Sequence, residues 1–248
     1  MALPKIDLPL FEMTLPTTQK TVKYRQYTVK EEKILLVANE SKDAMQEVLA
    51  LKQVVNNCLV DVDVLELPMI DLEYAYLMLR SKSVDNSLDF NIKDPDTDES
   101  VNLKLDVDEI KLEIGDDFLE SSKIKLNDEY SLFLRLPNID NFIKIIEMDP
   151  KDPLVNYFIL VSCLDKVASE DEIHDFKNYT QNEIDAFMET LTNTVVSQIQ
   201  KFFENMPRLR HEMKSGTNKP TKFETQTAPR WYWGPFLLEE KKEILKNL

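Results

Sequence analysis

The sequence predicts an α+β protein in which helical segments pack with β-hairpins and small antiparallel sheet elements. Apolar and polar residues alternate between residues 88 and 107, with Leu88 and Phe90 on one side, which is typical of β-strands. Over Val195–Met206 the apolar residues recur every three or four positions, which is typical of an amphipathic helix. The alternating and helical stretches occupy separate parts of the chain, as they do in α+β proteins.

Residues 1–27 are predicted to form N-terminal strands. Two short alternating stretches, Leu8–Leu15 and Thr21–Tyr27, suggest a hairpin or a pair of edge strands. Proline is tolerated at sheet edges, and this region holds Pro4, Pro9 and Pro16.

Residues 28–82 are predicted to be a helical segment. Its first helix begins with the T-x-x-E pattern of a capping box, Thr28 to Glu31, in which each side chain accepts the other's free backbone N–H. The helix is expected to end near Asn39. These features favour a structural strand-to-helix corner over a substrate site. The apolar stripe of the helix is expected on Ile34, Leu35, Val37 and Ala38.

Two more helices are expected before residue 83. Ser41 is well placed to cap the second helix, and Pro68 marks the break before the third. Apolar residues of the second helix recur at helical spacing: Ala44, Val48, Leu51, Val55 and Cys58. The apolar side of the third helix is expected to carry Ile70, Tyr74, Leu77 and Met78.

Residues 83–137 are predicted to be a β-hairpin segment. Its strands are centred on Leu88–Ile92 and Val101–Val107, and the turn-rich sequence KDPDTDES joins them. The alternation then slips by one position, which indicates a bulge or bend near Asp108–Glu109. A further strand is expected over Tyr130–Leu136.

Residues 138–206 are predicted to be a helical core segment. Leu154–Val167 is apolar enough to form a buried central helix, and Thr180 begins a second capping box. The aromatic residues of the last helix lie within its apolar stripe, so we expect core positions rather than a stacking platform for Phe202 and Phe203.

Residues 207–248 form a C-terminal segment with an aromatic cluster and a short helix expected over Phe236–Leu248. Either the aromatic rings cap the domain's own core, or they anchor a partner, because Trp and Tyr are enriched at interface hot spots. In the second case the helix would face that partner or another copy of the chain. The candidate partner-binding residues are Trp231, Tyr232, Trp233 and Phe236.

The composition excludes several function classes. A net charge of −15 repels phosphate, which argues against binding of nucleic acid or anionic membranes, although residues 201–230 are mildly basic. Apolar runs such as Tyr157–Val161 are far too short to span a bilayer, and no N-terminal signal peptide is visible. Only three glycines occur, well apart, so phosphate-binding loops are not expected.

Residues that could catalyse a reaction or bind a metal are scarce. The chain has two cysteines, Cys58 and Cys163, and two histidines, which is too few for a disulfide framework or a local zinc site. Both cysteines have apolar neighbours and are expected to be buried thiols. We therefore expect no enzyme activity and no cofactor. The alternative is a metal-dependent hydrolase that uses the acidic cluster Asp94–Glu99, but this cluster lacks the Gly and Glu that a calcium loop requires.

Three stretches carry a resemblance to a known family. They are LPLFEMTLPTTQKTVKYRQYTVKEEKILLVANES, LKQVVNNCLVDVDVLELPMIDLEYAYLMLRSKSV and KNYTQNEIDAFMETLTNTVVSQIQKFFENMPRLRH. In order and spacing they resemble the baseplate hub subunits of T4-type contractile-tailed phages over most of residues 3–213. In that family the K-E-E-K corner is a framework element.

The resemblance implies a tail morphogenesis protein, either a baseplate hub subunit or a hub assembly factor. It would act by binding other hub and tail proteins in the host cytoplasm during assembly, and as a subunit it would remain in the virion baseplate. Members of the family commonly carry C-P-x-C in the hairpin turn and a second cysteine pair near the C-terminus. Here Asp94–Thr97 and Thr217–Pro220 contain no cysteine, so zinc is not expected.

Overall fold

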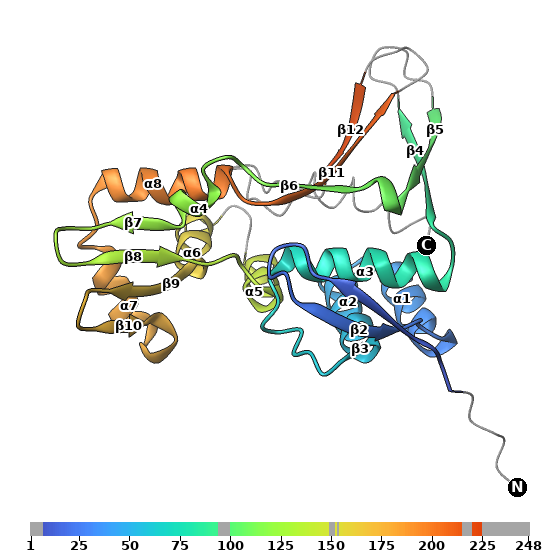
Figure 1. Cartoon of the computed structure of the whole chain (residues 1–248), viewed down its shortest axis with the longest axis horizontal. Helices are drawn as coiled ribbons and strands as arrows, with labels where there is room; N and C mark the ends of the chain where they lie inside the picture. Colours follow the sequence, from blue (N-terminus) through green and yellow to red (C-terminus); the bar gives the residue numbers. More distant parts are fainter. Residues whose placement is uncertain (1–6, 94–99, 149–151, 153, 215–219, 225–248) are drawn as a thin grey trace, which may run out of the picture. The chain divides into compact units, whose positions relative to one another are not determined.

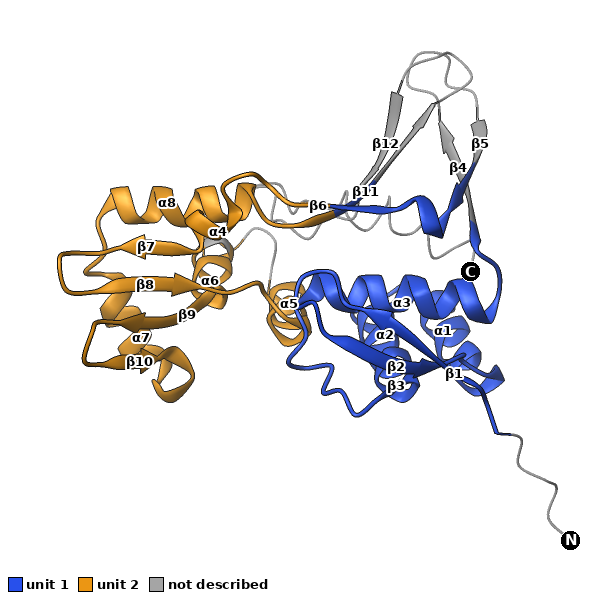
Figure 2. Ribbon diagram, viewed as in Figure 1, with its two compact units in different colours: residues 1–112, 209–225, 234–248 blue, residues 113–208, 226–233 orange. Residues whose placement is uncertain are grey.

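The computed structural model describes residues 7–93, 100–148, 152, 154–214 and 220–224, and confirms the α+β class (Figure 1). The chain divides into two compact units (Figure 2). Unit 1 contains the described residues up to Leu112 together with residues 209–224, and unit 2 contains the described residues from Glu113 to Arg208.

The N-terminal sheet of unit 1 confirms the predicted hairpin and adds a strand. β1 (Leu10–Thr14) pairs antiparallel with β2 (Thr21–Arg25), and β2 also pairs with β3 (Leu59–Val60), so β2 is the central strand. On β2 the alternation is as expected, since Val22 and Tyr24 are buried on one face. A two-residue strand such as β3 is too short for a periodic pattern to predict it.

Three helices follow, and one of them begins differently from the prediction. α1 (Val29–Ser41) has the predicted capping box, and α2 (Ala44–Cys58) packs against it. The expected cap of α2, Ser41, is instead the last residue of α1, because its hydroxyl donates to the carbonyl of Ala38. Lys42 turns the chain with a φ of 53°, and the side chain of Asp43 caps α2.

α3 (Met69–Ser83) is the central helix of unit 1 and is buried on almost every side, not on one side as predicted. The buried positions include Asp71, whose carboxylate accepts hydrogen bonds from the backbone N–H groups of Thr17 and Thr18 at 2.8 and 3.1 Å. Farther along the helix, Arg80 donates to the carbonyl of Ser87 at 3.0 Å. Charged residues within this helix thus hold the β1–β2 turn and the start of the next strand.

The predicted β-hairpin is confirmed. β4 (Ser87–Lys93) pairs in register with β5 (Ser100–Asp106), and a 3₁₀ turn over Val107–Glu109 lies at the predicted bend. The turn that contains Asp94–Glu99 lies outside the described residues.

A second three-stranded sheet has the order β12-β11-β6. β6 (Lys111–Glu113) is short, whereas β11 (Arg208–Lys214) and β12 (Pro220–Glu224) form an antiparallel hairpin whose backbone register pairs Arg210 with Glu224.

Unit 2 is built on a four-stranded antiparallel sheet of order β10-β9-β8-β7. Its strands are β7 (Lys123–Lys125), β8 (Ser131–Leu134), β9 (Leu164–Ala168) and β10 (Ile173–Asp175). The capping box predicted at Thr180 is confirmed. The described helices of this unit are α4 (Phe118–Ser121), α5 (Ile139–Glu147), α6 (Val155–Ser162), α7 (Gln181–Met188), α8 (Asn193–Glu204) and a 3₁₀ turn (Phe176–Asn178).

The helix predicted over Leu154–Val167 is wrong in its second half. α6 ends at Ser162, and after Cys163 the chain continues as β9, which pairs with both β8 and β10. A short, continuous apolar run fits a buried helix and a buried strand equally well, so periodicity alone does not distinguish them. Here the pairing of β9 with strands distant in sequence makes this segment a strand.

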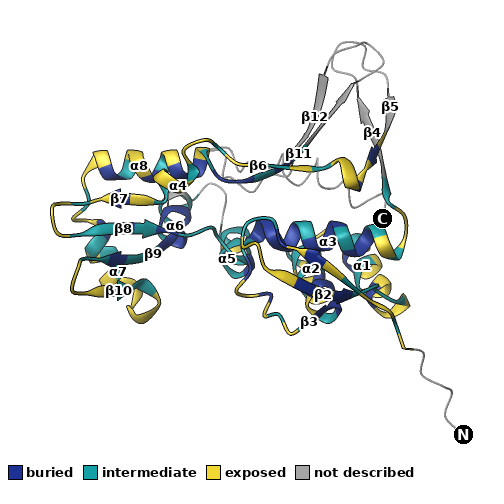
Figure 3. Ribbon diagram, viewed as in Figure 1, coloured by how far each residue is buried: buried dark blue, intermediate teal, exposed yellow. Residues whose placement is uncertain are grey.

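The core of unit 2 confirms the expectation for the last helix. Phe202 and Phe203 on α8 are both buried, and Phe118 of α4 stacks on Phe202 with ring centroids 5.5 Å apart. Figure 3 shows the buried and exposed sides of α8. Cys163 belongs to the same core as a free, buried thiol.

We expect Phe203→Ala to lower the free energy of unfolding by about 3–5 kcal/mol, because a buried ring is replaced by a cavity. Urea unfolding followed by circular dichroism measures this loss. Leu119→Ala, at a side chain that is 80% exposed in the same unit, is the control and should change the value by less than about 0.5 kcal/mol. Equal stability of Phe203→Ala and the wild type would mean that the ring is not a core residue.

Gly115 is required by a close backbone approach. A Cβ atom at this position would lie 2.8 Å from the Cα of Asn205, nearer than side chains pack, and the Gly115 N–H donates to the Asn205 carbonyl at 3.3 Å. Gly115→Ala should therefore cost about 1–3 kcal/mol of stability in the same urea experiment. Asp116→Ala, at the exposed neighbouring position, should cost little. A neutral Gly115→Ala would contradict the tight contact.

Candidate functional site

A buried carboxylate fixes the helix on which the candidate site lies. The Glu31 side chain is fully buried and forms an ion pair with Arg25 of β2, with an Nη2–Oε1 distance of 3.0 Å. It also accepts hydrogen bonds from the N–H and hydroxyl of Thr28 at 2.9 and 2.7 Å. Asn57 of α2 donates to it at 3.5 Å. One carboxylate therefore joins β2, α1 and α2.

The donors around Glu31 control its ionisation. Burial alone would raise the pKa of this carboxyl group, but the hydrogen bonds from Arg25 and Thr28 outweigh burial and lower the pKa to about 2. Glu31 is thus ionised over the whole physiological range. Its role is structural, because all its partners belong to the framework of unit 1.

The opposite side of α1 presents aliphatic side chains to solvent. Ala38 lies two turns after Glu31 on the buried side. Away from that side, Val29, Leu36 and Val37 are 64%, 49% and 72% exposed. We call these three residues the α1 outer face. The prediction that Val37 belongs to the buried stripe is wrong, because the buried Glu31 sets the rotation of the helix.

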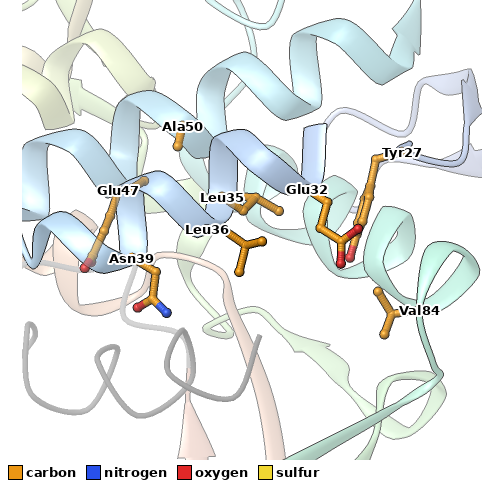
Figure 4. A pocket seen from close by; sticks show the side chains of 9 residues that line it. Tyr27, Glu32, Leu35, Leu36, Asn39, Glu47, Ala50 and Val84 are labelled. Atoms are coloured by element: carbon orange, nitrogen blue, oxygen red, sulfur yellow. The ribbon is translucent and has the colours of Figure 1, made fainter. Parts of the chain in front are cut away.

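A groove lies next to the α1 outer face, between α1, α2 and the end of α3 (Figure 4). It encloses about 60 Å³. Its apolar lining includes Leu35, Leu36 and the exposed Val84. We call it the α1 groove, and its lining residues are Tyr27, Glu32, Leu35, Leu36, Ala38, Asn39, Glu47, Ala50 and Val84.

The charged side chains of the α1 groove are acidic. Glu32 lies beside Tyr27 and Glu47 lies toward the other end (Figure 4), and the described lining contains no lysine, arginine or histidine. Burial raises the pKa of Tyr27, and Glu32 adds a smaller contribution in the same direction. The groove therefore favours an apolar ligand that carries a positive charge.

Unit 2 has a second hollow of about 390 Å³. Its described lining is neutral, so it offers no electrostatic preference for a ligand. The lining residues are Leu126, Asn127, Tyr130, Val167, Phe187, Thr190, Leu191, Thr192 and Val195.

Metal ligands and thiols are the groups to consider for chemistry in the part of the chain that the structure describes. No cluster of three or more His, Cys, Asp or Glu is arranged there to hold a metal ion. Burial raises the pKa of the Cys58 thiol to about 11 and that of Cys163 to about 12, so both stay protonated and unreactive. On the surface, His174 bridges Tyr179 and Glu172 at 2.7 and 3.2 Å.

Comparison with known protein families finds a match over most of the chain. The family described as T4 bacteriophage base plate protein matches residues 8–227, which is most of the chain. The chain belongs to this family. No curated protein and no solved structure matches it.

The family membership confirms the resemblance to T4-type baseplate proteins that the sequence motifs carry. As a baseplate protein the chain has a structural role in the phage tail, other tail proteins are its partners, and the virion tail is where it acts. None of the described helices is both long and apolar enough to cross a membrane.

The predicted partner-binding residues of the baseplate protein stay a prediction. Trp231, Tyr232, Trp233 and Phe236 lie outside the described residues and beyond the family match, which ends at residue 227. The acidic cluster Asp94–Glu99 also lies outside the described residues.

The sequence analysis did not predict the α1 outer face, although the sequence contained a signal for it. Apolar residues occur around the whole of α1, and one side of a helix cannot bury them all.

The ion pair of Glu31 predicts a pH dependence. A folded-state pKa of about 2 is below the unfolded value near 4.5, so the stabilisation is present above pH 4.5 and is lost as the pH falls toward 2. At pH 7, Glu31→Gln should lower the free energy of unfolding by about 2–3 kcal/mol.

Thermal and urea unfolding between pH 7 and pH 2.5 measure this effect. The difference between wild type and Glu31→Gln should shrink steadily below pH 4.5. The control Glu40→Gln, at an exposed glutamate of the same helix, should follow the wild type at every pH. A Glu31→Gln deficit that does not change with pH would contradict the assignment.

Proposed function

We propose that this baseplate protein is a hub subunit or a hub assembly factor that acts by binding and not by catalysis. The observation that carries the proposal is the α1 outer face, an exposed aliphatic surface on a helix held rigidly by the Glu31 network. Such patches on soluble proteins mark interaction sites. In this account the protein meets its tail partners in the host cytoplasm during assembly.

The free energies of burial and of association indicate how large the interface must be. Full burial of three aliphatic side chains would contribute roughly 4–8 kcal/mol. Association costs about 4–15 kcal/mol in lost translational and rotational freedom. The α1 outer face is therefore the apolar centre of a larger interface. Lys33 and Glu40, which are exposed on the same side of α1, suit a polar rim.

The test is Val37→Lys in a tagged chain supplied to cells infected with the phage that encodes it. The substitution removes the apolar contact that Val37 would make at the centre of the interface, and it places an unpaired positive charge there. We expect capture of tail proteins to fall at least tenfold, which corresponds to about 1.4 kcal/mol. Quantitative mass spectrometry of the captured proteins measures it.

Leu119→Lys is the matched control, because it places the same change at an exposed aliphatic residue of unit 2 and should leave capture unchanged. If Val37→Lys captures tail proteins as well as the wild type does, the α1 outer face is not the interface. Mass spectrometry of mature particles separates the two roles, since a hub subunit is retained and an assembly factor is not.

A further inference from the structure

We infer that the solvent-facing side of the unit 2 sheet binds an acidic amphipathic helix of a tail partner, with Phe133 at the centre of the contact. This surface belongs to unit 2 and not to the α1 outer face, so its role goes beyond the proposed function. We call it the lysine face, and it comprises Lys123, Lys125, Phe133, Lys166, Ala168 and Ile173.

The unit 2 sheet has one buried face and one face that meets solvent. Its strands β7 to β10 lie side by side (Figure 1). Ile124, Leu132 and Val167 are opposite one another in the register and are buried in the core of unit 2. Because side chains alternate along a strand, the residues next to them point away from that core and form the lysine face. Lys123 and Lys125 on this face are exposed.

Two ammonium groups of the lysine face share one aromatic ring. The register places Lys123, Phe133 and Lys166 next to one another on three strands, and the two Nζ atoms lie 5.5 and 5.3 Å from the centre of the ring. The ring attracts each cation, but it has no net charge that could offset their repulsion. Within the described residues, no carboxylate lies within 4.0 Å of either ammonium group. Both cations are therefore available to carboxylates of a partner.

Apolar side chains lie beside these cations. Ile173 of β10 is 69% exposed and pairs in register with Ala168 of β9. Ala168 follows Lys166 by two positions, so it lies on the same face of the sheet. Phe133 itself is only half-buried. A partner that covers the lysine face must therefore bring apolar side chains and carboxylates together.

A helix meets this requirement better than an extended strand does. In a helix, residues i, i+3, i+4 and i+7 share one side, so that acidic and apolar residues can face the sheet together. In a strand, neighbouring residues point to opposite sides. Glutamates at i and i+4 of a helix are about 6 Å apart along its axis, which suits two ammonium groups that lie near one ring.

The charges around the lysine face favour a protein partner over nucleic acid. Asp128 pairs with Lys125 at 2.8 Å, and Asp175 lies opposite Lys166 in the register. These carboxylates would repel the continuous charge of a phosphate backbone, whereas a helix has carboxylates only at certain positions. The net charge of −15 opposes any acidic partner at a distance, but salt screens it beyond about 8 Å, so the lysines dominate at contact.

Fluorescence anisotropy with the purified full chain tests the inference. The probe is a labelled alanine-rich peptide of about 16 residues, with Glu at i and i+4 and Leu at i+3 and i+7. Wild type should bind it at least tenfold more tightly than a matched peptide with Lys in place of Glu. The double variant Lys123→Glu with Lys166→Glu should reverse this preference. Phe133→Ala should weaken binding of the acidic peptide at least threefold.

Lys201→Glu is the matched control, because Lys201 is exposed on α8, which packs on the buried side of the sheet. This variant and Val37→Lys should each change the affinity less than twofold, and far-UV circular dichroism should show every variant folded. Equal affinity of wild type for the two peptides, or an unchanged preference in the double variant, would overturn the inference. Tighter binding of a single-stranded oligonucleotide than of the acidic peptide would also overturn it, since nucleic acid would then be the ligand.

Discussion

The surface of α1 depends on the buried carboxylate of Glu31. Its donors come from β2, from the first residue before the helix and from α2, so its position sets the rotation of α1 about its own axis. With Glu31 directed inward, Ala38 follows it inward. The side chains of Val29, Leu36 and Val37 then have no core to enter. A single buried charge thus determines both the packing of unit 1 and the apolar surface that it presents.

The ion pair provides orientation more than net stability. A buried ion pair must offset a large desolvation penalty, and a well-packed apolar replacement is often as stable. In α1, however, apolar residues lie around much of the helix, so hydrophobic burial alone gives little preference for one rotation. A rotation that buried Val37 would remove Glu31 from its donors. We regard this selection of one orientation as the main contribution of the Arg25–Glu31 pair.

Local signals predicted much of the fold. The capping boxes at Thr28 and Thr180, the β4–β5 hairpin and the core aromatic residues of α8 each depend on neighbours within a few positions or on one clear period. β9 was predicted as helix because only its pairing with distant strands identifies it. The α1 groove could not be predicted for the same reason. Its walls come from α1, α2 and Val84, which meet only in the folded unit.

For the interface proposed on the α1 outer face, the charge of the chain favours a different protein over a second copy as the partner. Each copy carries a net charge of −15, so two copies repel each other at long range, whereas a less acidic or basic tail protein would be attracted. In the proposed function, the acidic body opposes self-association, while the apolar helix face stays available for a tail protein of different charge.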